Sequence, residues 1–261
     1  MTNDLNFLET KKKEFEKKGY LILKTDLLHD PNFLEIKDNI YLDLNNELKN
    51  NHVKRLPGYI MGNLNVYPGK YGYQILELLK KKDIIKKIEF VLGQNIQHYN
   101  IEFGGNLSLA NKGLQLFHID GNFLKKMTLI SIATEDIGFK NGPTEVCVGT
   151  HKKDYKFWEF VLKKKEKTKL LLNTGEIVIR KHNLWHRGTK NNSNNTRLLL
   201  SMILTSGLDK KKNHFKSNEE LKIGSNFFKK SFFSKYYEFI YSKFGFIIVF
   251  SKIILSIFKN K

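Results

Sequence analysis

The sequence between residues 175 and 188 reads Gly-Glu-Ile-Val-Ile-Arg-Lys-His-Asn-Leu-Trp-His-Arg-Gly. Its first part is a short β-branched run that opens on a glycine, which is typical of a strand with a buried face. A second apolar run begins at Arg197, a few polar residues after His186. Short strands separated by turn residues predict an antiparallel sheet that closes into a barrel or sandwich.

The same pattern extends over residues 95–208. Short apolar runs alternate there with turns rich in Gly, Asn and Asp, and they predict strands at residues 96–103, 114–119, 127–133, 144–148, 176–179 and 197–204. A lysine-rich stretch at residues 152–173 interrupts the series, and we interpret it as an excursion between strands. The chain is therefore expected to be mainly β with flanking helices.

The first 92 residues are rich in helix formers. Apolar residues spaced by three and four positions predict helices at residues 7–18, 32–48 and 73–90, with a short strand at residues 20–23. Pro57, Pro68 and several glycines predict a loop or lid over residues 56–71. We expect two parts in the chain: a β domain with N-terminal helices at residues 1–208, and a basic, aromatic-rich helical tail at residues 209–261.

Charge and cysteine usage exclude several classes of protein. The chain of 261 residues has a net charge of +19, but only four of its 45 basic residues are arginine, the side chain that DNA readers favour. We therefore expect no nucleic-acid partner. A single cysteine, Cys147, forms no intramolecular disulfide, and the polar N-terminus shows no signal peptide, which favours a cytoplasmic protein. Where lysine is so strongly preferred, an arginine is expected to have a geometric role.

Two histidines and an aspartate form the candidate chemical site. In a strand, His118 and Asp120 would point to the same face, because successive side chains alternate. An antiparallel fold can bring His186 beside them, which would complete the two-histidine, one-carboxylate triad of non-haem Fe(II) oxygenases. His182 competes with His186 for the third position. Arg197 lies eleven residues after His186 and opens an apolar run, where its fork suits a carboxylate ligand.

Together these motifs resemble the phytanoyl-CoA dioxygenase family of Fe(II)/2-oxoglutarate-dependent oxygenases. The family has a His-x-Asp, a later His followed by Arg-Gly, and an arginine eleven residues beyond that His. Supporting stretches are Asn141-Gly142-Pro143-Thr144-Glu145-Val146, Gly149-Thr150-His151-Lys152, and Asn192-Ser193 between His186 and Arg197. One departure is Gly188, where relatives often have a hydroxyl that touches 2-oxoglutarate; Thr189 is a candidate replacement.

The resemblance implies a double-stranded β-helix, a jelly-roll-like barrel, with Fe(II) on His118, Asp120 and His186 and 2-oxoglutarate anchored by Arg197. The implied reaction is hydroxylation of a small organic or lipid-like substrate by O2, with decarboxylation of 2-oxoglutarate to succinate. The carboxylate of Asp120 favours hydroxylation, since halogenating relatives lack that ligand. The alternative is a membrane-peripheral binding or assembly protein that retains an unused iron site.

Other polar and aromatic residues near these motifs have simpler interpretations. His98, His151 and His182 are interpreted as structural or surface residues, and Trp185 as a core residue in preference to a substrate-binding ring. Asn122, two residues after Asp120, would share the inward face if the strand continued, and is a weaker candidate for substrate contact. Nucleobase-repairing relatives have a second arginine six residues after the first, at the position that Ile203 occupies here.

The basic tail contains 12 lysines against 4 acidic residues, together with dense aromatic and aliphatic clusters. Its longest apolar stretch, residues 244–258, includes Lys252 and is shorter than the ~20 residues of a membrane span. Two interpretations remain open. The tail either packs on the barrel or a dimer partner, or lies in a membrane interface with lysines reaching anionic lipid, with Gly245 allowing a bend between segments.

Overall fold

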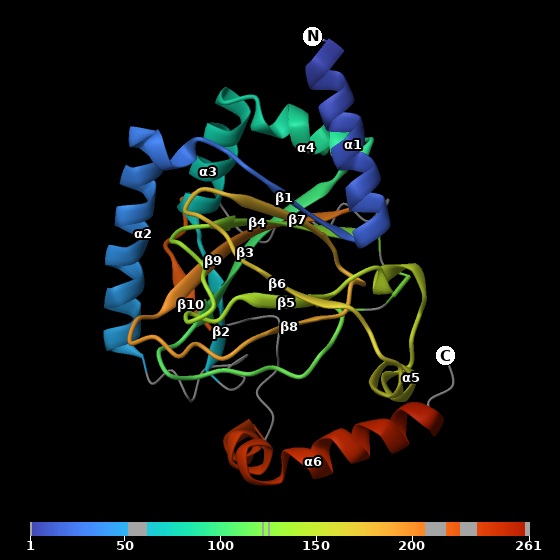
Figure 1. Cartoon of the computed structure of the whole chain (residues 1–261). Coiled ribbons are helices and arrows are strands. Elements are labelled where there is room, and N and C mark those ends of the chain that lie inside the picture. Colours follow the sequence, from blue (N-terminus) through green and yellow to red (C-terminus); the bar gives the residue numbers. More distant parts are fainter. Residues whose placement is uncertain are drawn as a thin grey trace.

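The protein forms two facing β-sheets with helices on the outside (Figure 1). The computed structural model describes residues 2–51, 62–121, 123–124, 126–206, 218–224 and 234–258. The major sheet has the antiparallel order β1 (Tyr20–Leu23), β7 (Ile177–Lys181), β4 (Met127–Ala133), β9 (Arg197–Thr205), β3 (Asn100–Ser108), β2 (Asn63–Tyr67) and β10 (Lys222–Ile223). The minor sheet has the order β6 (Lys167–Leu170), β5 (Thr144–Cys147) and β8 (His186–Gly188).

In the described part of the chain, six α-helices surround these sheets: α1 (Thr2–Lys18), α2 (Pro31–Asn50), α3 (Lys70–Lys81), α4 (Ile84–Leu92), α5 (Phe157–Leu162) and α6 (Ser234–Phe258). Short 3-10 turns lie at Leu27–His29, Ile96–His98 and Thr150–Lys152. The first four helices bury their apolar faces against the major sheet in one large core. A second core, which includes Val146, Val178 and Leu184, lies between the two sheets. This arrangement confirms the expected double-stranded β-helix with flanking helices.

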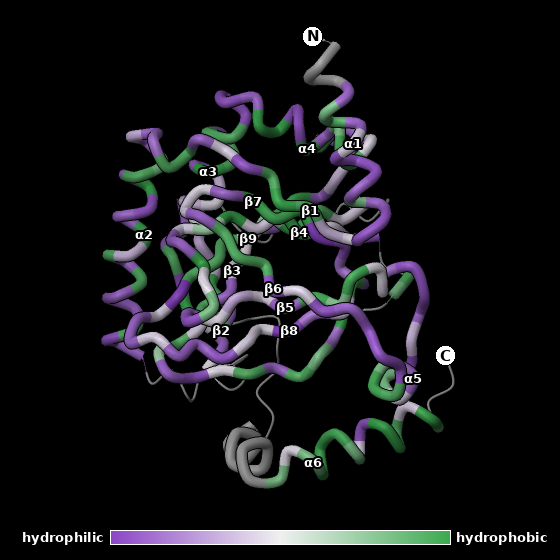
Figure 2. The backbone as a smooth tube through the Cα atoms, viewed as in Figure 1, coloured by the Kyte–Doolittle hydropathy of each residue, from purple (hydrophilic) through white to green (hydrophobic). Residues whose placement is uncertain are grey.

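Hydropathy follows these layers (Figure 2). The strands β1, β4 and β7 are hydrophobic along much of their length, whereas the helices alternate between hydrophilic and hydrophobic residues. The alternation arises because each helix buries one side on the sheet and exposes the other to water. The last helix, α6, lies below the minor sheet beside α5, away from the other helices (Figures 1 and 2).

The expected helix at residues 73–90 was wrong in one respect, because the structure has two helices there. Asp83, with φ of 55°, takes a left-handed conformation between α3 and α4 and ends the first helix. The side chain of the preceding Lys82 pairs with buried Asp30 at 2.6 Å. Apolar spacing continues through this break, and so periodicity alone did not reveal it.

The expected loop at residues 56–71 is also corrected in part. Residues 52–61 lie outside the described part of the chain, but Asn63–Tyr67 form β2, which pairs with β3. Four of its five residues are buried, so the strand lacks the polar–apolar alternation that sequence patterns detect. Polar Asn63 and Asn65, and the Pro-Gly pair that follows, gave the segment the composition of a loop.

Three further segments differ from the expected pattern. Residues 96–103 divide into a 3-10 turn and the longer strand β3, which continues through two glycines to Ser108. Residues 114–119 form no regular strand and make a single bridge, from His118 to His186. The lysine-rich excursion supplies α5 and also β6, which pairs with β5.

The basic tail contains a strand as well as a helix. Lys222 and Ile223 pair with Tyr67 and Val66 of β2, and Leu221 and Ile223 are buried in the main core. Part of residues 209–261 therefore belongs to the edge of the major sheet. The bend expected near Gly245 occurs one residue earlier, at Phe244, whose φ of −129° and ψ of 32° are not helical.

Candidate active site

The two halves of the predicted triad are joined through the backbone. The amide of His118 donates to the carbonyl of His186, and the amide of His186 donates to the carbonyl of His118, both at 2.9 Å. The amide of Asp120 donates to the carbonyl of His182 at 2.9 Å. Backbone hydrogen bonds at His118 and Asp120, two residues apart, therefore attach this segment to β8 and the residues before it. The two side chains point the same way even though no regular strand forms at residues 114–119.

One potential ligand atom from each of His118, Asp120 and His186 lies within 4.8 Å of the other two. Asp120 Oδ2 lies 3.6 Å from His186 Nε2, and Asp120 Oδ1 lies 4.0 Å from His118 Nε2. The side chain of His186 is only 8% exposed, whereas that of His118 is 40% exposed. The cluster is therefore open to solvent on the His118 side and closed on the His186 side.

Backbone carbonyls orient both imidazole rings. His118 Nδ1 lies 2.8 Å from the carbonyl of Leu116, and His186 Nδ1 lies 2.9 Å from the carbonyl of Leu184. A carbonyl only accepts, so each Nδ1 carries the proton in these contacts and each Nε2 keeps its lone pair. This is the tautomer that a metal-ligating histidine needs.

Charge and burial favour the ligand forms of all three side chains. Burial lowers the pKa of His118 and lowers that of His186 well below its ordinary value, so both rings are neutral. Burial alone would raise the pKa of Asp120, but the neighbouring histidine rings and Arg180, which is charged and donates a hydrogen bond to it, lower this pKa below its ordinary value. Two neutral imidazoles and one carboxylate are the donor set that non-haem iron accepts.

Arg180 is a member of this site that the sequence motifs did not reveal. Its Nη2 donates to Asp120 Oδ2 at 2.6 Å, and its Nη1 lies 3.0 Å from His186 Nδ1. Arginine only donates, so a hydrogen bond from Arg180 needs His186 Nδ1 without its proton, whereas the bond to the carbonyl of Leu184 needs Nδ1 with its proton. The two bonds therefore require different tautomers of His186. The firm partner of Arg180 is thus Asp120. The only signal in the sequence was the rarity of arginine.

Arg197 lies at the start of β9 and is 1% exposed. Its Nη2 donates to the carbonyl of Gly142 at 2.6 Å, while its contacts with Asn106 and Asn141 are longer, at 3.4–3.5 Å. Burial lowers its pKa to about 10. Among the described residues no carboxylate lies within ion-pair distance of this guanidinium, so a buried positive charge has no direct counter-charge.

A row of polar side chains connects Arg197 with the histidine–aspartate cluster. Asn63 is paired with Ser108 across β2 and β3, and Ser108 is paired with Arg197 across β3 and β9. Directly paired residues in a sheet point to the same face. Both side-chain atoms of Asn63, and Oγ of Ser108, are buried without a hydrogen-bond partner in the described part of the protein.

Gly188 links this row to His186, two residues before it. A Cβ atom built on Gly188 would lie 3.2 Å from Asn63 Oδ1 and 3.0 Å from Gln115 Oε1. Buried polar atoms without partners are rare and costly, and they indicate a place where a polar ligand binds. A dicarboxylate that reaches from the cluster to Arg197 would pass these groups, so the residues present fit 2-oxoglutarate.

The other candidate residues from the sequence make contacts outside the ligand cluster. His182 Nδ1 lies 2.9 Å from the carbonyl of Met127, and His151 Nε2 lies 3.1 Å from that of Glu16. Trp185 stacks on Phe160 with ring centres 4.0 Å apart, as a core residue. Thr189 Oγ1 donates to the carbonyl of Pro143 at 2.6 Å and does not fill the space beside Gly188.

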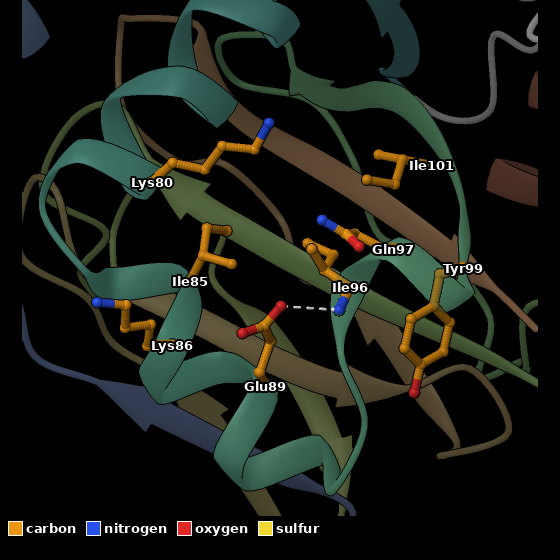
Figure 3. A pocket seen from close by; sticks show the side chains of 8 residues that line it. All are labelled: Lys80, Ile85, Lys86, Glu89, Ile96, Gln97, Tyr99 and Ile101. Carbon is orange, nitrogen blue, oxygen red and sulfur yellow. Dashed lines mark hydrogen bonds between the residues drawn. The ribbon is translucent and has the colours of Figure 1, made fainter.

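Among the described residues, His98 and Ile203 do not belong to this cluster. Asn122 lies outside the described residues. His98 is in the 3-10 turn before β3, and Ile203 is on β9, six residues beyond Arg197. A pocket of about 320 Å³ between α3, α4 and that turn is lined by Lys80, Glu89 and Tyr99, among others (Figure 3). None of the four predicted site residues lines it.

Solved structures with the same fold include several iron enzymes. The epimerase SnoN from nogalamycin biosynthesis, in complex with Fe3+, alpha ketoglutarate and nogalamycin RO, is 15% identical with a TM-score of 0.57, over 78% of this chain and 85% of that one. AviO1 from Streptomyces viridochromogenes Tue57 is 13% identical with a TM-score of 0.59, over 77% and 95%. EctD from S. alaskensis with bound Fe is 14% identical with a TM-score of 0.56, over 76% of each chain. Likeness at these identities shows the fold.

The fold and the histidine–aspartate cluster define the class of Fe(II)- and 2-oxoglutarate-dependent dioxygenases. Residues 91–199 match the model of the phytanoyl-CoA dioxygenase (PhyH) family, the family that the motifs predicted. The matched segment contains His118, Asp120, His186 and Arg197. No protein with a curated description matches the sequence.

Proposed function

We propose that the chain hydroxylates a small organic or lipid-like substrate while 2-oxoglutarate is decarboxylated to succinate. His118, Asp120 and His186 would hold Fe(II), and Arg197 would hold the distal carboxylate of 2-oxoglutarate. The observation that carries this proposal is the convergence of three ligand atoms within 4.8 Å, continued by a buried polar row that ends at Arg197.

Bound Fe(II) supplies the O2 and one-electron chemistry of the reaction. The protein supplies the positions of the ligands. The carbonyls of Leu116 and Leu184 aim His118 and His186 at one point. Arg180 holds Oδ2 of Asp120, which leaves Oδ1 on the side of His118. The presence of this carboxylate favours hydroxylation, because no ligand position is left free for a halide.

Arg197 has the geometry of a carboxylate anchor. One edge of its guanidinium is fixed by the carbonyl of Gly142, and the remaining N–H groups have only long contacts. Shorter, two-point bonds to a carboxylate would compensate the buried charge. Asn63 and Ser108 lie in the same row and would give the co-substrate the polar partners that they themselves lack.

Asn63→Leu tests this co-substrate site by two measurements, of which one should stay unchanged and the other should change. The side-chain atoms of Asn63 make no hydrogen bond in the described structure, so the ligand-free protein should lose no stability. The half-saturating concentration of 2-oxoglutarate should rise about tenfold, as expected from one lost hydrogen bond of ~1.5 kcal/mol. Thermal unfolding without ligand and succinate release at varied 2-oxoglutarate measure the two effects.

Asn191 is the matched control for Asn63. It is equally buried, but its side-chain Nδ2 donates to the carbonyls of Ser108 and Asn195. Asn191→Leu should therefore lower the thermal stability of the ligand-free protein. If Asn63→Leu destabilises the protein as much as Asn191→Leu does, Asn63 has a structural role and not a ligand-binding one.

The enzyme and the alternative, a membrane-peripheral binding protein with an unused iron site, differ in turnover. The enzyme should release succinate from 2-oxoglutarate only when Fe(II) and O2 are both present, and a matching substrate from a panel should increase the rate. Chelation of iron or removal of O2 should stop it. A protein that binds iron and 2-oxoglutarate but never forms succinate, with any substrate of the panel, would support the alternative.

A further inference from the structure

The C-terminal helix α6 divides at Phe244, and its second segment, residues 245–258, has two unlike faces. One face carries Val249, Ile253 and Ser256, which are half-buried. Residues three and four positions apart lie on the same side of a helix, so this face forms a continuous stripe. The helix is therefore attached along one side only.

The attached side meets α5. The amide of Trp158 donates to Ser256 Oγ at 3.1 Å, and Lys252 Nζ lies 5.9 Å from the centre of the Phe157 ring. Beneath them, Phe160 of α5 stacks on Trp185, the residue before His186. Phe160 also packs against Phe117, the residue before His118, with ring centres 5.4 Å apart. The helix is thus connected, through α5, to the neighbours in sequence of His118 and His186.

The other side of the segment is hydrophobic and exposed. Phe246 is 73% exposed, Phe250 63% and Phe258 77%, and the same face and its flanks include Ile247, Ile254, Leu255 and Ile257. Exposed Val161 and Leu162 of the contacting helix α5 are further apolar residues in this region. Large hydrophobic side chains rarely gather on a surface that meets only water, and such a surface marks an interaction site.

The charge of this part of the sequence indicates the partner of the exposed face. From residue 239 to the end of the chain there are four lysines and no acidic residue. A second copy of the chain would bring two segments of like charge together. An anionic bilayer accepts both features, because phenylalanines enter the interface while lysines extend to the headgroups. None of the helices in the described part of the chain is long and apolar enough to span a membrane.

We propose that this face of α6 docks the protein on an anionic lipid bilayer. Docking depends only on the face of α6. Its consequence, that the substrate is a molecule dissolved in the bilayer, rests in addition on the proposed oxygenase function.

Vesicle flotation with the full chain tests the docking. The protein should float with vesicles of equimolar phosphatidylcholine and phosphatidylglycerol, and binding should weaken as salt is raised. It should bind vesicles of phosphatidylcholine alone much more weakly. Phe250→Ser should lower partitioning into the mixed vesicles about 10- to 100-fold, as expected for removal of one buried phenylalanine.

Phe139→Ser is the matched control, since Phe139 is 65% exposed, as Phe250 is at 63%, but lies before β5 and away from α6. It should float like the parent chain. The proposal is overturned if the parent ignores mixed vesicles, if Phe250→Ser floats equally well, or if the chain instead forms a dimer that Phe250→Ser dissociates. A large loss of thermal stability in Phe250→Ser would also overturn it, because the face would then be packed and not free.

These outcomes stay separate from the oxygenase proposal. Succinate release from 2-oxoglutarate in the absence of vesicles measures the iron site alone. If the protein does not float with vesicles but releases succinate, the docking proposal is rejected and the oxygenase proposal stands. If the protein floats but releases no succinate, the oxygenase proposal and the substrate dissolved in the bilayer are rejected. The docking proposal then stands.

Discussion

His186→Ala is expected to abolish succinate formation and to reduce bound iron to a level near that of the metal-free protein. The proposed site has only three protein ligands, and His186 supplies the most buried of them. Loss of one nitrogen donor leaves a single histidine and Asp120, too few to hold Fe(II) against water. Iron content after dialysis and succinate release at saturating 2-oxoglutarate measure the two effects.

His182→Ala is the control for this experiment. His182 is also buried and lies four residues earlier, but its ring contacts the carbonyl of Met127 and does not belong to the ligand cluster. This variant should keep iron and turnover, even if its melting temperature falls. Activity in His186→Ala together with inactivity in folded His182→Ala would show that the ligand assignment is wrong.

Arg197→Lys is expected to raise the half-saturating concentration of 2-oxoglutarate about 10- to 100-fold. Lysine keeps the positive charge but has no planar fork, so one charge-assisted hydrogen bond of roughly 1.5–3 kcal/mol is lost. The rate at saturating 2-oxoglutarate should change much less, because Arg197 does not contact the proposed iron ligands. Steady-state succinate release over a range of 2-oxoglutarate concentrations separates the two parameters.

Arg187→Lys makes the same chemical change next to His186. Arg187 pairs with Glu145 at 2.7 Å and lies over the ring of Phe117, on the opposite side of β8 from the polar row. Its replacement should leave the response to 2-oxoglutarate unaltered. Equal shifts in both arginine variants, or none in Arg197→Lys, would remove Arg197 from the role of co-substrate anchor.

Local sequence pattern determined much of the architecture. The strands at residues 20–23 and 127–133 have the expected limits, because their β-branched and aliphatic residues specify both an extended backbone and its buried face. Helices α1 and α2 lie within a few residues of the predictions. The His-x-Asp spacing and the eleven residues from His186 to Arg197 indicated the site, because these residues lie close together in sequence or in a known family order.

The structure corrected patterns whose signal was ambiguous. A left-handed aspartate divides one amphipathic stretch into α3 and α4 without disturbing its spacing. The strand β2 resembled a loop, since its polar residues are Asn63 and Asn65 and both of its faces are covered. Such positions depend on the surroundings that tertiary packing provides, and propensity is weak there.

The sequence by itself determined the fold class, the histidines and aspartate of the cluster, and the candidate anchor Arg197. Only the tertiary structure decided that Arg180 holds Asp120 from 60 residues away, and that Asn63 joins Ser108 and Arg197 in one polar row. It also decided which face of α6 is covered by α5. The physical reason is that periodicity records how each residue relates to its own strand or helix. Contacts between distant segments depend on sheet register and helix packing, which no short stretch of sequence contains.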